Sequence, residues 1–228
     1  MPPARPSKRF LFALLEGDLA AITGGTGVDA ASANMKNRPL FRTDRYVGVD
    51  LSTAELEAGL SLHPGATGIV ADLSAQELPS GFARVCVSTN TFYHLSPAGR
   101  LHASQTLTRA LEPGGTLLIH TPRADGYRHL LAWLQGAFER VDVVRTRNVL
   151  SIAYERLMER GGRFDEHPRS LALRALARGL ALLERLACRL PLGQRDVYLR
   201  CTGKRGGGTM PLELNALVRL GERLYRAR

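Results

Sequence analysis

Short apolar runs alternate with helical patterns over the first 120 residues, and this alternation constrains the fold more than any other feature of the chain. Five apolar runs are predicted to be strands: residues 19–23, 46–50, 68–72, 84–89 and 116–120. Ser52 and Glu55 form a capping box that predicts a helix after the second run, and residues 97–111 have the apolar periodicity of another helix. Strands that alternate with helices at this spacing predict a doubly wound α/β domain with a parallel sheet.

The second half of the chain is expected to hold two more strands and a long helix between them. Residues 141–144 and 196–201 are the predicted strands, and residues 170–190 the predicted helix. The helix has apolar residues at 173, 176, 180, 183, 187 and 190, a regular helical spacing. We expect this seam to pack on the sheet or over a substrate, and the solvent-facing side to carry Arg174, Arg178, Arg185 and Arg189. Alternatively, the helix touches an anionic membrane or a phosphorylated, lipid-linked substrate.

The formal net charge of +10 lies entirely in the second half. The chain has 31 Lys+Arg and 21 Asp+Glu, and the first 120 residues hold equal numbers of basic and acidic side chains. This asymmetry predicts a neutral core and a cationic surface on the second half. Hydrophobic residues make up 44% and charged residues 23% of the chain, which excludes collagen-like and wholly disordered classes.

The cysteines and the N-terminus bear on the compartment. No uncharged apolar run reaches 18 residues, and the N-terminus lacks the pattern of a signal peptide, so we expect neither a spanning helix nor a leader. Cys86, Cys188 and Cys201 have spacings that match no metal-binding knuckle, and no metal site is predicted. We expect a cytoplasmic protein whose Cys86 and Cys201 pack as small hydrophobes in strands.

Glycines and polar residues follow the predicted strands, at the edge of the sheet where ligands bind. A glycine loop, formed by Thr23, Gly24, Gly25, Thr26 and Gly27, follows the first strand. Asp50 ends the second strand 23 residues after Gly27, and a carboxylate there can accept both hydroxyls of a ribose. Such glycines let the backbone approach a ligand closely. The glycine loop, Asp50 and the spacing between them together indicate a cofactor, either nicotinamide or S-adenosylmethionine (SAM).

The catalytic pair of short-chain dehydrogenases is missing. These enzymes use a Tyr with a Lys four residues later, and the lysines of this chain are Lys8, Lys36 and Lys204. The positions four residues before them are occupied by Ala4, Ser32 and Arg200. The chain therefore lacks the catalytic pair that a short-chain dehydrogenase would need.

The first half of the chain resembles the class I SAM-dependent methyltransferases, in particular their small-molecule branch. The matching stretches are residues 46–52, 71–73 with 77–79, 87–91 with 94–95, and 107–117. They occur in the family's order, and the resemblance covers about residues 16–122. The family's first motif reads acid-x-Gly-x-Gly-x-Gly. Aligned on Gly25-Thr26-Gly27, its acid position is Ala21 and its first Gly is Thr23.

The resemblance implies a Rossmann-like, doubly wound sheet of seven strands, mostly parallel, whose last strand (196–202) is an antiparallel insertion. It implies SAM as the cofactor. By this alignment, Thr23, Gly24, Gly25 and Gly27 line the methionine and ribose, Asp50 holds the ribose hydroxyls, and the adjacent Leu51 also binds the cofactor. The adenine is held and covered by Asp72 and Leu73. The sulfonium end lies above Ser88, Thr89 and Asn90.

The acceptor site offers two catalytic candidates after the fourth strand. His94 is the best placed general base, and Tyr93 could orient an acceptor. His120, at the end of the fifth strand, is a weaker candidate. Residues 88–93 do not match the motif for amino-group methylation of nucleobases, and no Pro-Cys dipeptide of cytosine-C5 enzymes occurs.

We therefore expect one SAM-dependent methyltransferase domain over residues 1–205, with a basic helical insertion at about 165–192 and a tail with a short helix over 206–228. The expected reaction is methylation of a small-molecule or lipid-linked acceptor, with peripheral contact to an anionic membrane as a further expectation. Two alternatives remain: an RNA methyltransferase that uses the basic second half, and a catalytically inactive protein of the same fold.

Overall fold

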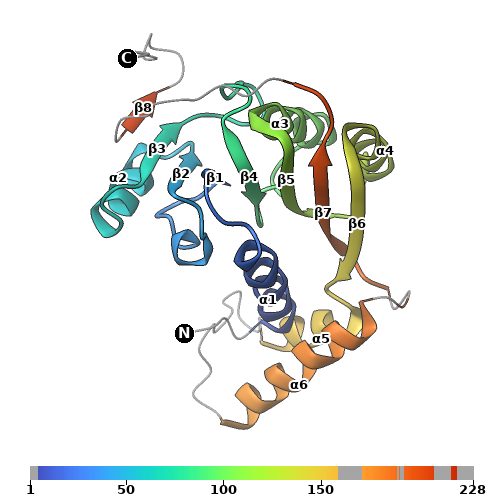
Figure 1. Cartoon of the computed structure of the whole chain (residues 1–228). Helices are drawn as coiled ribbons and strands as arrows, with labels where there is room; N and C mark the ends of the chain where they lie inside the picture. Colours follow the sequence, from blue (N-terminus) through green and yellow to red (C-terminus); the bar gives the residue numbers. More distant parts are fainter. Residues whose placement is uncertain (1–4, 159–170, 189, 191–192, 208–216, 220–228) are drawn as a thin grey trace. The chain divides into compact units, whose positions relative to one another are not determined.

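The computed structural model describes residues 5–158, 171–188, 190, 193–207 and, by backbone only, 217–219 (Figure 1). By its internal contacts the chain divides into two compact units. One comprises Met1–Asp18 with Val143–Tyr198, and the other Leu19–Asp142 with Leu199–Arg228. The predicted boundary at residue 205 stays a prediction.

The elements alternate as the sequence predicts. Six α-helices and one 3₁₀-helix lie in the described part of the chain: α1 (Pro6–Ala20), η1 (Arg38–Leu40), α2 (Thr53–Leu62), α3 (Pro97–Ala110), α4 (Tyr127–Ala137), α5 (Val149–Met158) and α6 (Leu171–Ala187). The strands are β1 (Thr26–Ala30), β2 (Arg45–Asp50), β3 (Thr67–Val70), β4 (Ala83–Ser88), β5 (Leu111–Pro122), β6 (Phe138–Thr146), β7 (Asp196–Lys204) and β8 (Leu217–Arg219).

All of these strands join one sheet in the order β6-β7-β5-β4-β1-β2-β3-β8. Strand β1 pairs in parallel with both β2 and β4, β2 with β3, and β4 with β5. The chain thus winds outward from β1 in one direction and from β4 in the other, so the switch point lies between these two strands. The arrows of β6 and β7 point in opposite directions (Figure 1). The prediction of a doubly wound, mostly parallel sheet is confirmed, and the short β8 adds an eighth strand beside β3.

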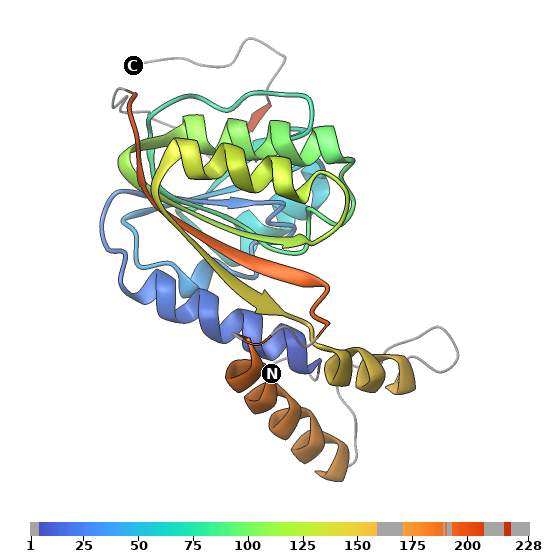
Figure 2. The same ribbon diagram turned by 90° about the vertical axis from the view of Figure 1, so that its right-hand side faces the viewer.

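The core consists of strands that are buried along their length, as expected for a parallel sheet covered on both faces. Val28, Val47, Val85 and Leu117 are almost fully buried. Helices α3 and α4 lie side by side over the sheet (Figure 2), and bury Leu107, Leu130 and Leu134. Cys86 and Cys201 are buried in β4 and β7, which confirms the prediction for both thiols.

The predicted strand over residues 19–23 is wrong. Leu19 instead belongs to the last turn of α1, and the first strand begins at Thr26. The physical reason is periodicity: Leu11, Leu15 and Leu19 recur every four residues and are all buried, as is Phe10, so the apolar run continues a helix. The glycine loop consequently precedes β1 instead of following it.

The predicted helix over 170–190 is present as α6, but its predicted packing seam is only partly right, because Ala187 is buried, Leu173 and Leu180 are half-buried and the other three seam residues are exposed. Ala177, Glu184 and Ala187 are the buried residues, whereas Leu176, Leu183 and Leu190 are exposed. The orientation follows from Glu184, whose Oε1 accepts the Asn148 N–H at 2.7 Å. Arg189 lies outside the described residues, as does most of the predicted tail helix. The described part of that tail, Leu217–Arg219, is the strand β8.

No described helix meets the length and hydropathy needed to span a bilayer.

The crossover between β1 and β2 contains no α-helix. Residues 31–44 form turns and the single-turn η1, and the crossover is anchored by the fully buried Met35. Met35 fills a recess left by Gly48 of β2 and Gly59 of α2. A Cβ at Gly59 would lie 2.7 Å from Cγ of Met35 and 3.0 Å from the backbone carbon of Asn34. Both glycines are therefore explained by the close approach of this crossover.

Replacing Gly59 by Ala should lower the free energy of unfolding by about 1–3 kcal/mol, because the added methyl group overpacks the contact with Met35 and Asn34. Gly179→Ala is the matched control, since a Cβ at this helical position meets no atom within 4 Å. It should raise stability by about 0.5–1 kcal/mol through helix propensity alone. Urea unfolding measures both. Equal effects of the two substitutions would contradict the packing of Met35.

Candidate functional site

The candidate site lies at the carboxyl ends of β1, β2, β4 and β5. The parallel registers bring these ends to one edge of the sheet: Ala30 pairs with both Val49 and Ser88, and Ser88 pairs with Ile119. Asp50, which ends β2, therefore lies at the same edge as Ser88. This edge includes the switch point between β1 and β4, where ligands of doubly wound sheets bind.

The glycine loop lies at the opposite edge. Gly27 pairs with Tyr46 and Val85, near the amino ends of β2 and β4, and the Gly25 N–H donates to Oδ2 of Asp44 at 2.9 Å. The predicted placement of Thr23, Gly24, Gly25 and Gly27 beside Asp50 is therefore wrong. Gly27 has a packing reason instead, because its Cβ would lie 2.4 Å from the Phe41 ring.

The loop that does follow β1 runs from Ala31 to Met35, and three of its residues have left-handed backbone conformations. Their φ angles are 57° at Ala31, 45° at Ala33 and 60° at Met35. Counted from Asp29, these are the three glycine positions of the acid-x-Gly-x-Gly-x-Gly pattern. A side chain in this conformation costs roughly 1–2 kcal/mol. We infer that Asp29 to Met35 is the first motif, with all three glycines replaced.

This loop was not predicted from the sequence, because the prediction relied on glycines and the loop contains none. The spacing held the signal: Asp50 comes 19 residues after Ala31, close to the roughly 20 residues that separate a phosphate-binding glycine motif from its ribose-binding acid in dinucleotide folds.

Asp50 is held by two backbone N–H groups, one on each carboxylate oxygen. Oδ2 accepts from Ala33 at 2.8 Å and Oδ1 from Ser52 at 2.9 Å. Each oxygen keeps a second acceptor position, so the carboxylate can still receive hydroxyl groups of a ligand. The adjacent Leu51 side chain is exposed. Asp50 thus links the loop after β1 to the end of β2.

Asp72 and Leu73 lie in the turn after β3, two and three residues beyond its end at Val70. Oδ1 of Asp72 accepts from the Ser74 hydroxyl at 2.6 Å and from the Ser74 N–H at 2.8 Å. These hydrogen bonds, the hydroxyl first, hold the pKa of Asp72 below its usual value. Leu73 is buried. The turn therefore presents an ionised carboxylate beside an apolar side chain.

Two buried hydroxyls at the ends of β4 and β5 have no hydrogen-bond partner. Ser88 is fully buried and Thr121 nearly so, and neither Ser88 Oγ nor Thr121 Oγ1 is bonded to another group. Thr89 is also buried, and Asn90 has a left-handed φ of 64°. Buried hydroxyls are normally paired, so a polar ligand group or water is the expected partner of these two.

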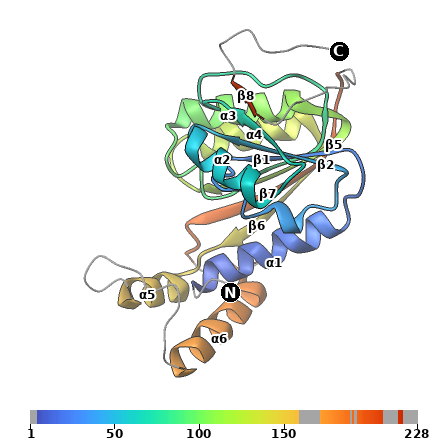
Figure 3. The ribbon, with the colours of Figure 1, turned by 90° about the vertical axis from the view of Figure 1, so that its left-hand side faces the viewer.

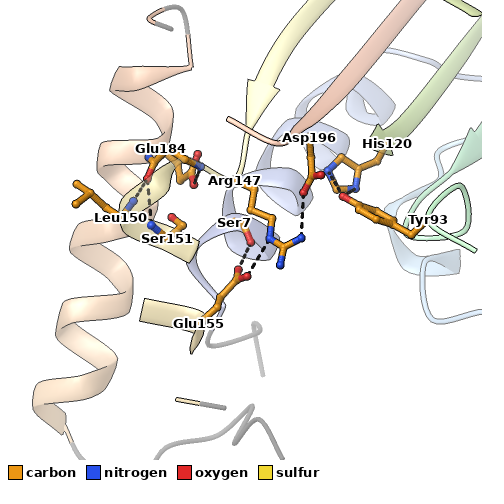
Figure 4. A network of polar contacts seen from close by, with 10 residues as sticks. Ser7, Tyr93, His120, Arg147, Leu150, Ser151, Glu155, Glu184 and Asp196 are labelled. Atoms are coloured by element: carbon orange, nitrogen blue, oxygen red, sulfur yellow. Dashed lines mark hydrogen bonds and ion pairs between the residues drawn. The ribbon is translucent and has the colours of Figure 1, made fainter. Parts of the chain in front are cut away.

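The structure places the catalytic candidates Tyr93 and His94 in different surroundings. The Tyr93 hydroxyl lies 3.3 Å from Nε2 of the buried His120, and the two rings are 5.5 Å apart (Figure 4). His94 is exposed in a turn, where its N–H donates to the Thr91 carbonyl at 2.9 Å. Tyr93 therefore pairs with His120, the histidine that the sequence ranked lower. In the described part of the chain, no cluster of three His, Cys, Asp or Glu could hold a metal ion.

Asp29 is buried beside the loop that it begins. Its Oδ2 accepts the Tyr46 hydroxyl at 2.8 Å and its Oδ1 the Asn37 amide at 3.3 Å. Burial raises the pKa of Asp29 to about 6 despite these hydrogen bonds, and the negative charge of Asp50 adds to the rise.

Replacing Ala31 or Ala33 by Gly should stabilise the protein by up to about 1 kcal/mol, because glycine removes the left-handed strain at the cost of some chain entropy. Ala30→Gly is the control, since Ala30 is buried in strand conformation and should lose stability. Urea midpoints give the comparison. If Ala31→Gly and Ala33→Gly lost as much stability as Ala30→Gly, the loop would not be strained.

The free energy of unfolding should fall as the pH rises from about 4 to about 6. Folded Asp29 keeps its proton up to about pH 6, whereas the unfolded side chain loses it near 3.8, so the folded state binds more protons between these values. The contribution is full below pH 4, is lost as pH passes 6, and amounts to about 3 kcal/mol. Asp29→Asn should flatten this part of the pH profile. An unchanged profile would show that Asp29 does not titrate there.

Comparisons with known proteins agree with this geometry. Residues 22–119 match the family model of a methyltransferase domain, which includes β1 to β4, most of β5, and the residues described above at this edge except His120 and Thr121. A search of curated protein sequences found no match.

Solved structures share the fold at low identity. A TehB-like SAM-dependent methyltransferase from Corynebacterium glutamicum is 17% identical, with 87% of this chain and 88% of that chain covered and a TM-score of 0.53. The N-methyltransferase NodS from Bradyrhizobium japonicum, in complex with S-adenosylhomocysteine (SAH), is 13% identical over 88% and 89%, with a TM-score of 0.57. The [4+2]-cyclase SpnF is 13% identical over 86% and 80%, with a TM-score of 0.53. Residues 22–119 thus match a methyltransferase domain, and the chain has the fold of SAM-dependent methyltransferases.

Proposed function

We propose that this chain transfers a methyl group from SAM to a small-molecule or lipid-linked acceptor at the carboxyl edge of β1, β2, β4 and β5. The observation that carries the proposal is the position of Asp50. Its two oxygens are oriented by the Ala33 and Ser52 N–H groups and can each accept one ribose hydroxyl. When bound, SAM supplies an electrophilic methyl group on a sulfonium.

The residues at this edge fit the remaining parts of such a cofactor. Asp72 would accept a hydrogen bond from the adenine, and Leu73 and Leu51 would contact its ring. The unpartnered hydroxyls of Ser88 and Thr121 would meet polar groups near the methionine part, together with Thr89 and Asn90. In this proposal the loop Ala31–Met35 replaces Thr23, Gly24, Gly25 and Gly27 as the cofactor loop.

Tyr93 and His120 are the proposed acceptor-side pair. Methyl transfer depends mainly on in-line positioning of the acceptor, and a base helps when the acceptor must lose a proton. A neutral His120 imidazole can accept that proton directly or through the Tyr93 hydroxyl, which lies within 3.4 Å of both of its ring nitrogens. His94, exposed on the same segment, is the second candidate for the base.

Three further points belong to the proposal. A cytoplasmic location is proposed from the free cysteines. The RNA alternative draws on the basic second half of the chain. The inactive alternative draws on the loop, because Ala31, Ala33 and Met35 stand where the family has glycine and no α-helix follows within residues 31–44. Cofactor affinity is therefore the first quantity to measure.

Asp50→Ala should weaken SAM and SAH binding about 10-fold or more, because one or two charge-assisted hydrogen bonds worth about 1.5–3 kcal/mol each are lost. Asp50→Asn, which keeps one acceptor oxygen, should have a smaller effect. Isothermal titration calorimetry gives the affinities, and thermal melting confirms folding of each variant.

Asp44→Ala is the matched control, because Asp44 binds the glycine loop at the opposite edge of the sheet. It should leave SAM affinity unchanged. If Asp44→Ala weakened SAM binding as much as Asp50→Ala, the cofactor site would be assigned to the glycine loop instead. Wild-type protein that binds neither SAM nor SAH would replace the proposal by the inactive alternative.

A further inference from the structure

Helix α6 presents leucine side chains to solvent along its length. Leu176, Leu182, Leu183 and Leu186 of α6, and Leu190 three residues beyond its end, are 43–67% exposed. The neighbouring α5, which contacts α6 (Figure 3), adds exposed Val149, Leu150 and Leu157. We call these eight side chains the leucine face. Single exposed leucines are ordinary, but eight exposed apolar side chains on two helices in contact point to an interaction surface.

The orientation of α6 is fixed by buried polar contacts. The side that faces inward carries Ala177, Ala187 and the fully buried Glu184, whose Oε1 accepts the Asn148 N–H that begins α5 (Figure 4). Asn148 in turn caps α5, because its Oδ1 accepts from Ser151 at 3.0 Å. Turning the leucines inward would expose Ala177 and break the contact of Glu184. The leucine face is therefore held outward by the structure of this unit.

The exposed charges beside the leucine face all have one sign. Arg178 and Arg185 of α6 and Arg156 of α5 are exposed, whereas the acids of the two helices, Glu155 and Glu184, are buried. Arg178 lies one turn from Leu182, and Leu182 one turn from Leu186 and Arg185. The described surface of α5 and α6 thus combines exposed leucines with an uncompensated positive charge.

We propose that the leucine face and its arginines dock this protein on an anionic lipid bilayer. A helix with leucines on one side and arginines beside them binds at the headgroup region, where apolar side chains enter the acyl boundary and cations meet acidic lipids. A second copy of the same face would place arginine against arginine. Nucleic acid would match the arginines but leave the leucines in contact with charged phosphates. The proposal rests on α5 and α6 alone and is independent of SAM binding.

Co-sedimentation with vesicles tests the proposal on the full chain. Wild-type protein should bind phosphatidylcholine vesicles that contain phosphatidylglycerol, more weakly at 300 mM than at 50 mM salt, and should bind pure phosphatidylcholine poorly. Arg178→Gln with Arg185→Gln should weaken binding about 25-fold at low salt, since each basic residue near the surface contributes about fivefold. Leu183→Gln with Leu186→Gln should weaken it at least 10-fold at both salt concentrations.

Matched controls lie on the other unit. Leu62 is as exposed as Leu186, and Arg42 and Arg128 are exposed arginines. Leu62→Gln, and Arg42→Gln with Arg128→Gln, should leave vesicle binding unchanged. Circular dichroism melting checks that each variant folds.

Several outcomes would overturn the proposal. One is wild-type protein that ignores anionic vesicles at low salt; another is binding that falls equally in the control variants. A concentration-dependent dimer that the leucine variants abolish would assign the face to a second copy of the chain. RNA binding that only the arginine variants reduce, without vesicle binding, would assign it to nucleic acid.

Discussion

The packing of Met35 between β2 and α2 is the constraint on which the candidate site depends. Without an α-helix between β1 and β2, the crossover is held by this buried side chain and by the hydrogen bond from Ala33 to Asp50. Gly48 and Gly59 leave the recess that Met35 occupies. The left-handed residues of the loop are therefore maintained by tertiary packing and not by their own conformational preference, which would favour glycine at each of them.

Much of the sheet could be predicted because its strands are short, apolar and separated by clear turns. Residues 46–50 and 84–89 were predicted within one residue of β2 and β4, and Ser52 caps α2 through the Glu55 N–H as expected. The start of β1 could not be predicted by the same means. Leu19 to Ile22 is apolar enough for a strand, and only the earlier helical spacing of Phe10, Leu11 and Leu15 assigns its beginning to α1.

The candidate site was predictable where it depends on strand ends and unpredictable where it depends on backbone conformation. Asp50 and Ser88 are the last residues of β2 and β4, and Asp72 comes two residues after β3, so the strand pattern predicted their positions. The loop Ala31–Met35 contains no glycine, so composition gave no sign of its φ angles. The orientation of α6 was also out of reach, because a spacing rule counts leucines and cannot anticipate that a buried glutamate binds the start of another helix. In both cases a tertiary contact determined the structure, and it overrode the preference of the local sequence.

The two hydrogen bonds of Asp50 give the site a built-in spectroscopic reporter. The amides of Ala33 and Ser52 donate to the same carboxylate that is proposed to receive a ligand. A hydroxyl that donates to this carboxylate lowers its strength as an acceptor and so weakens the hydrogen bonds from the two N–H groups. The chemical shifts of these two backbone nitrogens would therefore register occupancy at the end of β2, on two separate segments of the chain, without a label on the ligand.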